Sequence, residues 1–249
     1  MGFFDFFKKE KKENTEPLGL EWLQVDMHSH LIPGIDDGSK NLEESLSLIR
    51  RLKELGLRKL VTTPHVMSEY YRNTPEIIQL GLQDLREAIA KEGLDISIEA
   101  AAEYYIDEIF LEKVEKGEKL LTIAKNLVLV ETGFINKPQM LFETLFNLEL
   151  QGYKPVLAHP ERYQYLIHDK NLQNDLLDRN VYFQVNLLSL TGFYSKTVKE
   201  FAELLIDEGK VKFFGTDCHN HRYLDMLDSL PKSRYYHKLK SMDLLNHTL

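Results

Sequence analysis

The residues best suited to chemistry in this 249-residue chain are histidines and carboxylates that follow short apolar runs. His28 and His30 are two residues apart, so on an extended segment their side chains point to the same side and can bind one cation. Comparable residues come later in the chain: His65, Glu103, Glu131, His159, Asp217 and His219. Any one of these alone would more often be a buried hydrogen-bonding group or a salt-bridge partner. Because burying so many ionisable groups together is costly without a counter-cation, their combination predicts a metal site.

The sequence gives less support to catalysis through a covalent intermediate. Cys218 is the only cysteine, and Arg222 follows it too closely for the Cys-x5-Arg motif of cysteine-dependent phosphatases. We therefore expect Cys218 to be a small buried residue between two metal ligands. The Gly-x-Ser-x-Gly motif of serine hydrolases is not found in the sequence.

Seven apolar runs must position these residues. Several of them are nearly continuous in β-branched, leucine or aromatic residues, which is typical of strands buried on both faces. The predicted strands are Leu23–His28, Lys59–His65, Ile96–Tyr104, Leu127–Thr132, Pro155–His159, Val181–Leu187 and Val211–Thr216.

Amphipathic stretches lie between the predicted strands, and four of them are followed by a glycine suited to a helix C-cap. The predicted helices are Leu42–Leu55, Pro75–Lys91, Ile106–Lys116, Pro138–Leu150, Leu172–Arg179 and Lys196–Glu208. This alternation predicts an α/β fold with a parallel sheet, most economically closed into a TIM-like (β/α)7 barrel. An open doubly wound sheet is the alternative, although no glycine-rich phosphate loop follows the first run. In a barrel the carboxyl ends of the strands converge, so the histidines and carboxylates would meet in one pocket.

The composition excludes several classes of protein. With 31 Lys and Arg against 39 Asp and Glu, the formal net charge is −8, which argues against a nucleic-acid partner. No apolar run approaches the roughly 18 residues of a transmembrane segment. A single cysteine excludes an internal disulfide and suits the cytoplasm. Residues 1–17 are predicted to be a flexible aromatic and charged arm, and residues 18–249 a single domain.

Taken together, the motifs resemble those of the PHP (polymerase and histidinol phosphatase) superfamily. They are His28-Ser29-His30, the loop Pro33–Gly38, His65, Glu103, Glu131, His159-Pro160-Glu161-Arg162-Tyr163 and Asp217-Cys218-His219-Asn220. Within this superfamily the chain is most similar to the CpsB/CapC-type bacterial protein-tyrosine phosphatases, from about Val25 to the C-terminal region. The resemblance implies a distorted seven-stranded α/β barrel with three divalent metal ions, usually Mn²⁺ or iron, with Zn²⁺ and Mg²⁺ as other options.

The resemblance also implies a role for each motif residue. The first metal would be held by His28, His30, Glu103 and Asp217. Glu103 would bridge to a second metal, completed by Glu131 and His159. The third would be held by Asp37, His65 and His219, with Asp37 preferred to Asp36 because it directly precedes a glycine. Arg162 would bind the substrate phosphate, and Arg222 is the nearest match to a second family arginine, although it comes early in the chain.

Such a centre suits the hydrolysis of a phosphomonoester. Three divalent ions and four carboxylates leave a net charge of about +2, complementary to a phosphate dianion. A metal-activated hydroxide would attack phosphorus directly, and the phenolic leaving group of phosphotyrosine makes little demand on acid catalysis.

We therefore expect a protein-tyrosine phosphatase that regulates capsular or exopolysaccharide synthesis. Its expected partner, on the resemblance alone, is the C-terminal tail of a membrane-associated bacterial tyrosine kinase, which could bring the enzyme to the membrane. Two alternatives remain: a small-molecule phosphatase of the same superfamily, acting for example on histidinol phosphate, and a catalytically silent metal-binding scaffold.

Overall fold

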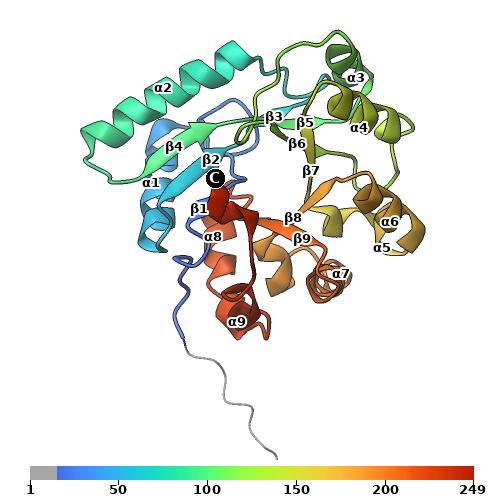
Figure 1. Ribbon diagram of the computed structural model, residues 1–249. Helices are drawn as coiled ribbons and strands as arrows, with labels where there is room; N and C mark the ends of the chain where they lie inside the picture. The colour runs from blue at the N-terminus through green and yellow to red at the C-terminus, as the bar shows by residue number, and fades with distance from the viewer. Residues whose placement is uncertain (1–15) are drawn as a thin grey trace, which may run out of the picture.

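The computed structural model of the protein describes residues 16–249. The aromatic part of the predicted arm therefore lies outside the described residues. At the arm's end, Glu16 is exposed and forms an ion pair with Lys240, at 2.7 Å between Oε1 and Nζ. In Figure 1 the strands occupy the middle of the molecule and the helices surround them.

Nine strands form two parallel sheets in the described part of the chain. The three-stranded sheet has the order β1-β2-β4 and the six-stranded sheet the order β3-β5-β6-β7-β8-β9. The strands are β1 (Val25–Asp26), β2 (Lys59–Thr62), β3 (His65–Val66), β4 (Ser97–Ala100), β5 (Glu103–Tyr105), β6 (Leu127–Glu131), β7 (Lys154–Ala158), β8 (Tyr182–Asn186) and β9 (Val211–Gly215). Each of the seven predicted runs thus overlaps at least one strand.

Two of the predicted strands are divided, and this division separates the sheets. The run Lys59–His65 becomes β2 and β3, because Pro64 has no N–H to donate to a regular ladder. The run Ile96–Tyr104 contains no proline, but it is also divided, into β4 and β5. In the three-stranded sheet β2 pairs with β4, and in the six-stranded sheet β3 pairs with β5. The same two segments of chain therefore contribute one strand each to both sheets.

The α/β class and the parallel sheets agree with the prediction, but the ladders of residues 16–249 do not form a closed barrel. Contact between the first and last strands is made by the segments that follow them. Ser29 and Cys218 form an isolated parallel bridge, and the His30 N–H donates to the Cys218 carbonyl at 2.9 Å. Asp217, next to this bridge, adopts a left-handed backbone conformation with φ of 51°, which a regular strand does not allow.

The predicted helices are present, with ends that differ by a few residues. They are α1 (Leu42–Glu54), α2 (Pro75–Lys91), α3 (Glu108–Glu115), α4 (Leu141–Leu150), α6 (Lys170–Asp178) and α7 (Lys196–Asp207). Sequence periodicity did not indicate the shorter helices α5 (Gln164–Ile167), α8 (His221–Leu227) and α9 (Tyr236–Leu239), or the 3₁₀ helices η1 (Pro160–Arg162), η2 (Leu187–Thr191), η3 (Leu230–Lys232) and η4 (Leu245–Thr248). No described helix is both long enough and apolar enough to cross a membrane.

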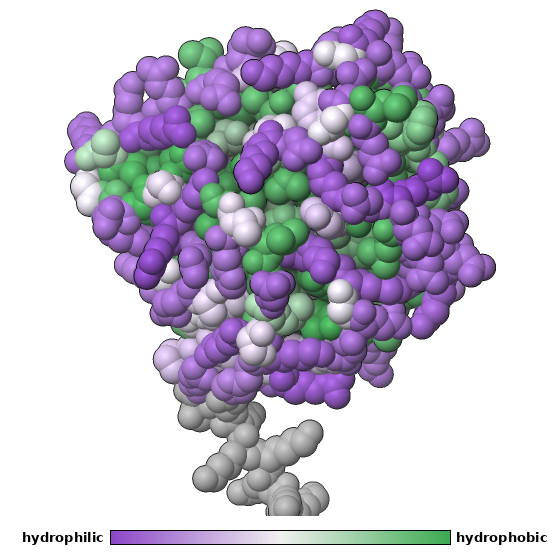
Figure 2. Space-filling view, viewed as in Figure 1, coloured by the Kyte–Doolittle hydropathy of each residue, from purple (hydrophilic) through white to green (hydrophobic). Residues whose placement is uncertain are grey.

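The C-terminal segment covers the amino ends of the strands. Leu245 and Leu249 pack against a core cluster that includes Val25, Val61 and Phe213, and in Figure 1 the C-terminus lies over the strands. On the face seen in Figure 2, hydrophilic residues predominate and hydrophobic patches lie between them. Because the C-terminal segment covers the amino ends of the strands, a site made of polar side chains is expected at their carboxyl ends.

Candidate metal centre

The structure brings all nine predicted metal ligands together. Seven of them end or follow a strand, whereas His65 and Glu103 are the first residues of β3 and β5. The ligand atoms of the nine residues form four groups, in each of which the atoms lie within 4.8 Å of one another. The groups are His30, Asp37, His65 and His219; His28, His30 and Glu103; His28, His159 and Asp217; and His65, Glu103 and Glu131. Residues separated by most of the chain thus share one location.

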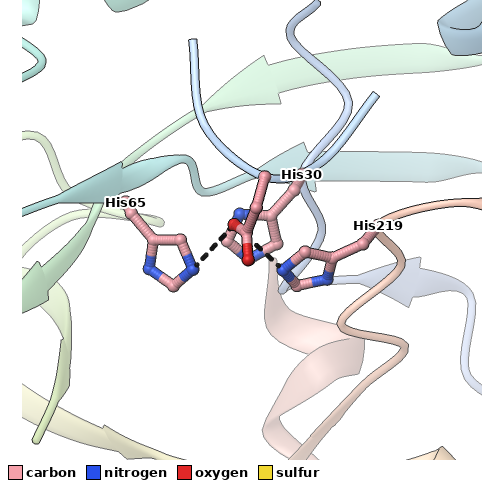
Figure 3. A group of neighbouring side chains, drawn as sticks. His30, His65 and His219 are labelled. Atoms are coloured by element: carbon pink, nitrogen blue, oxygen red, sulfur yellow. Dashed lines mark ion pairs between the residues drawn. The ribbon is translucent and has the colours of Figure 1, made fainter. Parts of the chain in front are cut away.

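Three histidines surround a single carboxylate at the outer side of this centre (Figure 3). The Asp37 Oδ1 atom lies 3.4 Å from His65 Nε2 and 3.5 Å from His219 Nε2. The rings of His30 and His219 are stacked with their centroids 4.0 Å apart. The Asp37 side chain is about half exposed (54%), so this group faces the opening of the site.

Glu103 lies at the middle of the centre and is completely buried. Its Oε2 atom is 3.2 Å from both His28 Nε2 and His65 Nδ1, and its Oε1 atom is 3.0 Å from His159 Nε2. Two oxygens directed at different histidines are what a bridging carboxylate requires. Glu131 Oε1 is 2.8 Å from His65 Nδ1, whereas its Oε2 is 3.9 Å from His159 Nε2. Glu131 therefore lies nearer to His65 than to the histidine with which the resemblance groups it.

Two of the candidate ligands depend on unusual backbone conformations. His159 directly follows β7 with φ of 33°, and Asp217 comes two residues after β9 with φ of 51°. Non-glycine residues rarely adopt this region, and such strain concentrates at functional sites. The Asp217 Oδ1 atom lies 3.4 Å from both His28 Nε2 and His30 Nε2.

The electrostatics of the buried centre fit a cation. Burial opposes ionisation, but the neighbouring histidines hold the pKa of Glu103 and Asp217 well below the ordinary range. In turn, the surrounding carboxylates raise the pKa of His65 to about 9 against the effect of burial. His159 Nδ1 is buried without a hydrogen-bond partner, and His65 Nδ1 and Glu131 Oε1 contact each other at 2.8 Å without hydrogen-bond geometry. Imidazole nitrogens and carboxylate oxygens with unused lone pairs are suitable ligands for Mn²⁺, iron or Zn²⁺.

Asp36 has a structural role that the sequence did not indicate. Its side chain is buried, and its Oδ2 atom lies 2.8 Å from His30 Nδ1. The Gly38 N–H donates to its Oδ1 at 2.9 Å. Asp36 thus orients His30 from behind while Asp37 faces the candidate ligands. The only signal in the sequence was the Asp-Asp-Gly motif itself, which does not say which aspartate faces inwards.

The two candidate phosphate-binding arginines lie in different surroundings. The Arg162 guanidinium carbon is 4.3 Å from the ring centroids of both Phe134 and Tyr194, and its Nη1 is 3.2 Å from Asp217 Oδ2. Arg222 is exposed in α8, with its guanidinium 5.4 Å from the Phe193 ring centroid. Only Arg162 of the two lines the cavity at the metal centre.

This cavity has a volume of about 230 Å³ and combines candidate ligands with aromatic walls. It is lined by Asp37, His65, Met67, Tyr71, Tyr105, Glu131, Thr132, Gly133, Phe134, His159, Arg162, Asp217, His219 and Tyr223. Cys218 does not line it. That residue is fully buried, and burial raises the pKa of its thiol. A group of this kind is a poor nucleophile at neutral pH.

Comparison with known proteins agrees with this geometry. The family model for capsular polysaccharide synthesis proteins, CpsB/CapC, matches residues 24–230. The chain belongs to the CpsB/CapC family. The resemblance inferred from the sequence motifs is therefore confirmed.

Several CpsB/CapC relatives are curated as tyrosine-protein phosphatases. The chain is 27% identical to tyrosine-protein phosphatase YwqE of Bacillus subtilis, over 79% of this chain and 77% of YwqE. It is 29% identical to tyrosine-protein phosphatase CpsB of Streptococcus pneumoniae, over 83% of this chain and 85% of CpsB. It also matches a chain from the crystal structures of these two proteins, described as unique metal-dependent tyrosine phosphatases. That match has a TM-score of 0.77 at 25% identity and covers 87% of this chain and 89% of the other.

Proposed function

We propose that this protein is a metal-dependent protein-tyrosine phosphatase that acts in capsular or exopolysaccharide synthesis. Family membership and the relatives' activity support the reaction class. The observation that carries the proposal is the convergence of nine histidines and carboxylates, six of which line one cavity together with Arg162. The proposed fold is a distorted (β/α)7 barrel, and the parallel bridge between Ser29 and Cys218, which connects the segments after β1 and β9, supports it.

The candidate ligands are proposed to hold three divalent ions, with Mn²⁺ as the first choice. His28, His30, Glu103 and Asp217 would hold one, and Glu131 and His159 would share Glu103 for the second. Asp37, His65 and His219 would hold the third. When bound, the ions would supply positive charge for the phosphate oxygens and activate water for attack on phosphorus. The buried, partly unsatisfied lone pairs described above support this arrangement.

Arg162 is proposed to bind and orient the phosphate. Its guanidinium is held between Phe134 and Tyr194, and one of its nitrogens is near Asp217 Oδ2. A planar guanidinium fixed on both faces retains N–H donors along its edge for a phosphate. Because its side chain is only 19% exposed, the arginine loses little conformational freedom when substrate binds. The exposed position of Arg222 gives it less support as a second phosphate ligand.

The size and lining of the cavity favour a phosphorylated side chain as substrate. The cavity at the metal centre has a volume of about 230 Å³, and Phe134 and Arg162 also line a second cavity of about 590 Å³, which gives a bound phosphate access to a wider surface. Tyr71, Tyr105 and Phe134 offer ring faces and edges to an aromatic group. A phosphotyrosine presented by a protein tail would place only its phenyl phosphate in the cavity. The proposed partner is accordingly the tyrosine-containing tail of a bacterial tyrosine kinase, reached from the cytoplasm.

Phosphate release from phosphotyrosine peptides tests this function. We expect turnover with Mn²⁺, loss of turnover with excess EDTA, and recovery when Mn²⁺ is returned. His159→Ala should abolish turnover because it removes a candidate ligand, whereas His247→Ala, at an exposed histidine near the C-terminus, should leave it intact. Turnover that is indifferent to EDTA would contradict the proposal.

The same assay separates the remaining alternatives. A higher kcat/KM for histidinol phosphate than for phosphotyrosine peptides would assign the chain to the small-molecule phosphatases. Mn²⁺ binding with turnover no faster than that of His159→Ala would indicate a catalytically silent scaffold.

A further inference from the structure

The strand β8 contributes no histidine or carboxylate to the metal centre, yet its carboxyl end lies within it. Gln184 and Asn186 are two residues apart on this strand and are both completely buried. Alternate residues of a strand share one face, so the two amides point to the same side of the sheet. That side faces His28 and Asp217.

A continuous series of hydrogen bonds joins these residues. The Asn186 Nδ2 group donates to Asp217 Oδ2 at 2.7 Å. The Gln184 Nε2 group donates to Asn186 Oδ1 at 2.9 Å. At the far end, Gln184 Oε1 lies 2.8 Å from His28 Nδ1. The two amides therefore connect two candidate ligands that are far apart in the sequence.

The chemistry of the end groups fixes the direction of every bond in this series. Asp217 Oδ2 also lies within hydrogen-bonding distance of Arg162 Nη1 and the Tyr194 hydroxyl, and a carboxylate can only accept. Asn186 must therefore turn its NH₂ group towards Asp217 and its oxygen towards Gln184. Gln184 must then donate to Asn186, which leaves its own oxygen to face His28. His28 Nδ1 lies 2.8 Å from that oxygen and must carry a proton, because two acceptor atoms do not face each other at hydrogen-bonding distance.

We propose that Gln184 and Asn186 act as positioning residues that select the metal-binding nitrogen of His28 and the metal-facing oxygen of Asp217. His28 is held with its proton on Nδ1, so the lone pair of Nε2 points to the site. Asp217 is held through Oδ2, so Oδ1 faces His28 and His30. This inference rests on the metal centre proposed above and adds two neutral residues to it.

The close packing around the Gln184 and Asn186 side chains supports their role in positioning the ligands. Gly215 on β9 lies against them, and a Cβ there would be 2.7 Å from the His28 Cβ and 3.1 Å from Gln184 Nε2. The Gln184 oxygen also accepts from the backbone N–H of His159 at 3.4 Å. The amides thus contact three candidate ligands. Groups that orient metal ligands from behind commonly contribute about 10–100-fold to metal affinity.

Metal binding to purified protein stripped of ions tests the proposal without measuring catalysis. We expect Gln184→Met to weaken Mn²⁺ binding about 10–100-fold in a chelator competition. Gln184→Glu keeps an acceptor for His28 Nδ1–H, so it should weaken Mn²⁺ binding less than about 3–10-fold, which is half of the Gln184→Met effect on a logarithmic scale. Gln173→Met is the matched control, because Gln173 is a fully buried, hydrogen-bonded glutamine in α6. It should leave Mn²⁺ affinity unchanged.

A spectroscopic measurement on the unmodified protein keeps the proposal testable if a variant does not fold. In the Zn²⁺-loaded protein, two-bond ¹H–¹⁵N spectra should show His28 protonated at Nδ1 and metal-bound at Nε2. Binding through Nδ1 would overturn the proposal, as would equal Mn²⁺ affinity in Gln184→Met and the unmodified protein. If the unmodified protein binds neither Mn²⁺ nor Zn²⁺, the metal centre itself is refuted.

Discussion

Substitution of the two neighbouring aspartates in the loop after His30 should affect different properties of the protein. Asp36 is buried, with Oδ2 at 2.8 Å from His30 Nδ1 and 3.2 Å from the His65 backbone nitrogen, and Oδ1 accepting from the Gly38 N–H. Asp37 is half exposed and faces His65 and His219 at 3.4 and 3.5 Å. We therefore expect Asp36→Ala to destabilise the metal-free fold and Asp37→Ala to reduce metal binding.

The magnitudes follow from burial. Removing one partner of a buried, hydrogen-bonded ion pair costs about 3–5 kcal/mol in the free energy of unfolding. At about 2–4 °C per kcal/mol for a chain of this size, Asp36→Ala should lower the Tm of the metal-free protein by about 6–20 °C. An exposed ion pair contributes about 0–1 kcal/mol, so Asp37→Ala should change that Tm by no more than about 4 °C.

Thermal unfolding in EDTA and Mn²⁺ content after gel filtration measure the two effects separately. Asp37→Ala should retain about one Mn²⁺ fewer than the unmodified protein at equal free Mn²⁺. Asp225→Ala, which removes an exposed carboxylate paired with Arg51, is a control for the loss of negative charge. The reasoning would be refuted if Asp37→Ala kept the full Mn²⁺ content while Asp36→Ala lost one ion at an unchanged Tm.

Three further predictions follow from the same structure. Arg162→Ala should lower kcat/KM for phosphotyrosine peptides about 10²–10³-fold, while Arg222→Ala should change it less than about threefold; equal effects would contradict the placement of the two arginines. Native protein should resist iodoacetamide, and Cys218→Ala should keep kcat within about twofold, because the thiol is buried and its pKa is raised; rapid labelling with loss of turnover would point to a nucleophilic cysteine. Asn246→Ala should lower the free energy of unfolding by about 2–4 kcal/mol, because its side chain makes three buried hydrogen bonds to the backbones of Val25 and Phe214. The kcat per folded molecule should not change. An unchanged denaturation midpoint would show that these hydrogen bonds contribute little to stability.

Most of the fold could be predicted because the signals are local. Each strand buried on both faces is a short apolar run, and each long helix has an apolar stripe over several turns. Residues Gly56, Gly117, Gly152 and Gly209 follow their helices with positive φ, as a C-cap requires. The helices α5 and α9 have only four residues each, too few to show a period. The sheet divides at Pro64 because this residue has no backbone N–H for a neighbouring strand. Which strand lies beside it cannot be read from the run Lys59–His65.

The candidate site divides in a similar way. Most of its histidines and carboxylates could be found because they lie at or near the end of an apolar run, and strand ends converge in a parallel α/β fold. Asp37 could be assigned only from the resemblance. Gln184 and Asn186 could not be found, because neutral amides are common and their partners are far away in the chain. His28 and Gln184, for example, are 156 residues apart.

The sequence by itself determined which strands carry charged and imidazole groups to a shared end, and that these groups need a cation. Only the tertiary structure decided that Asp36 lies behind His30, that Arg162 rather than Arg222 lines the cavity, and which nitrogen of His28 faces inwards. Apolar periodicity acts over a few consecutive residues and so is present in any local stretch of sequence. The direction of an individual oxygen or nitrogen is set by hydrogen bonds between distant segments, and these exist only after the strands have packed.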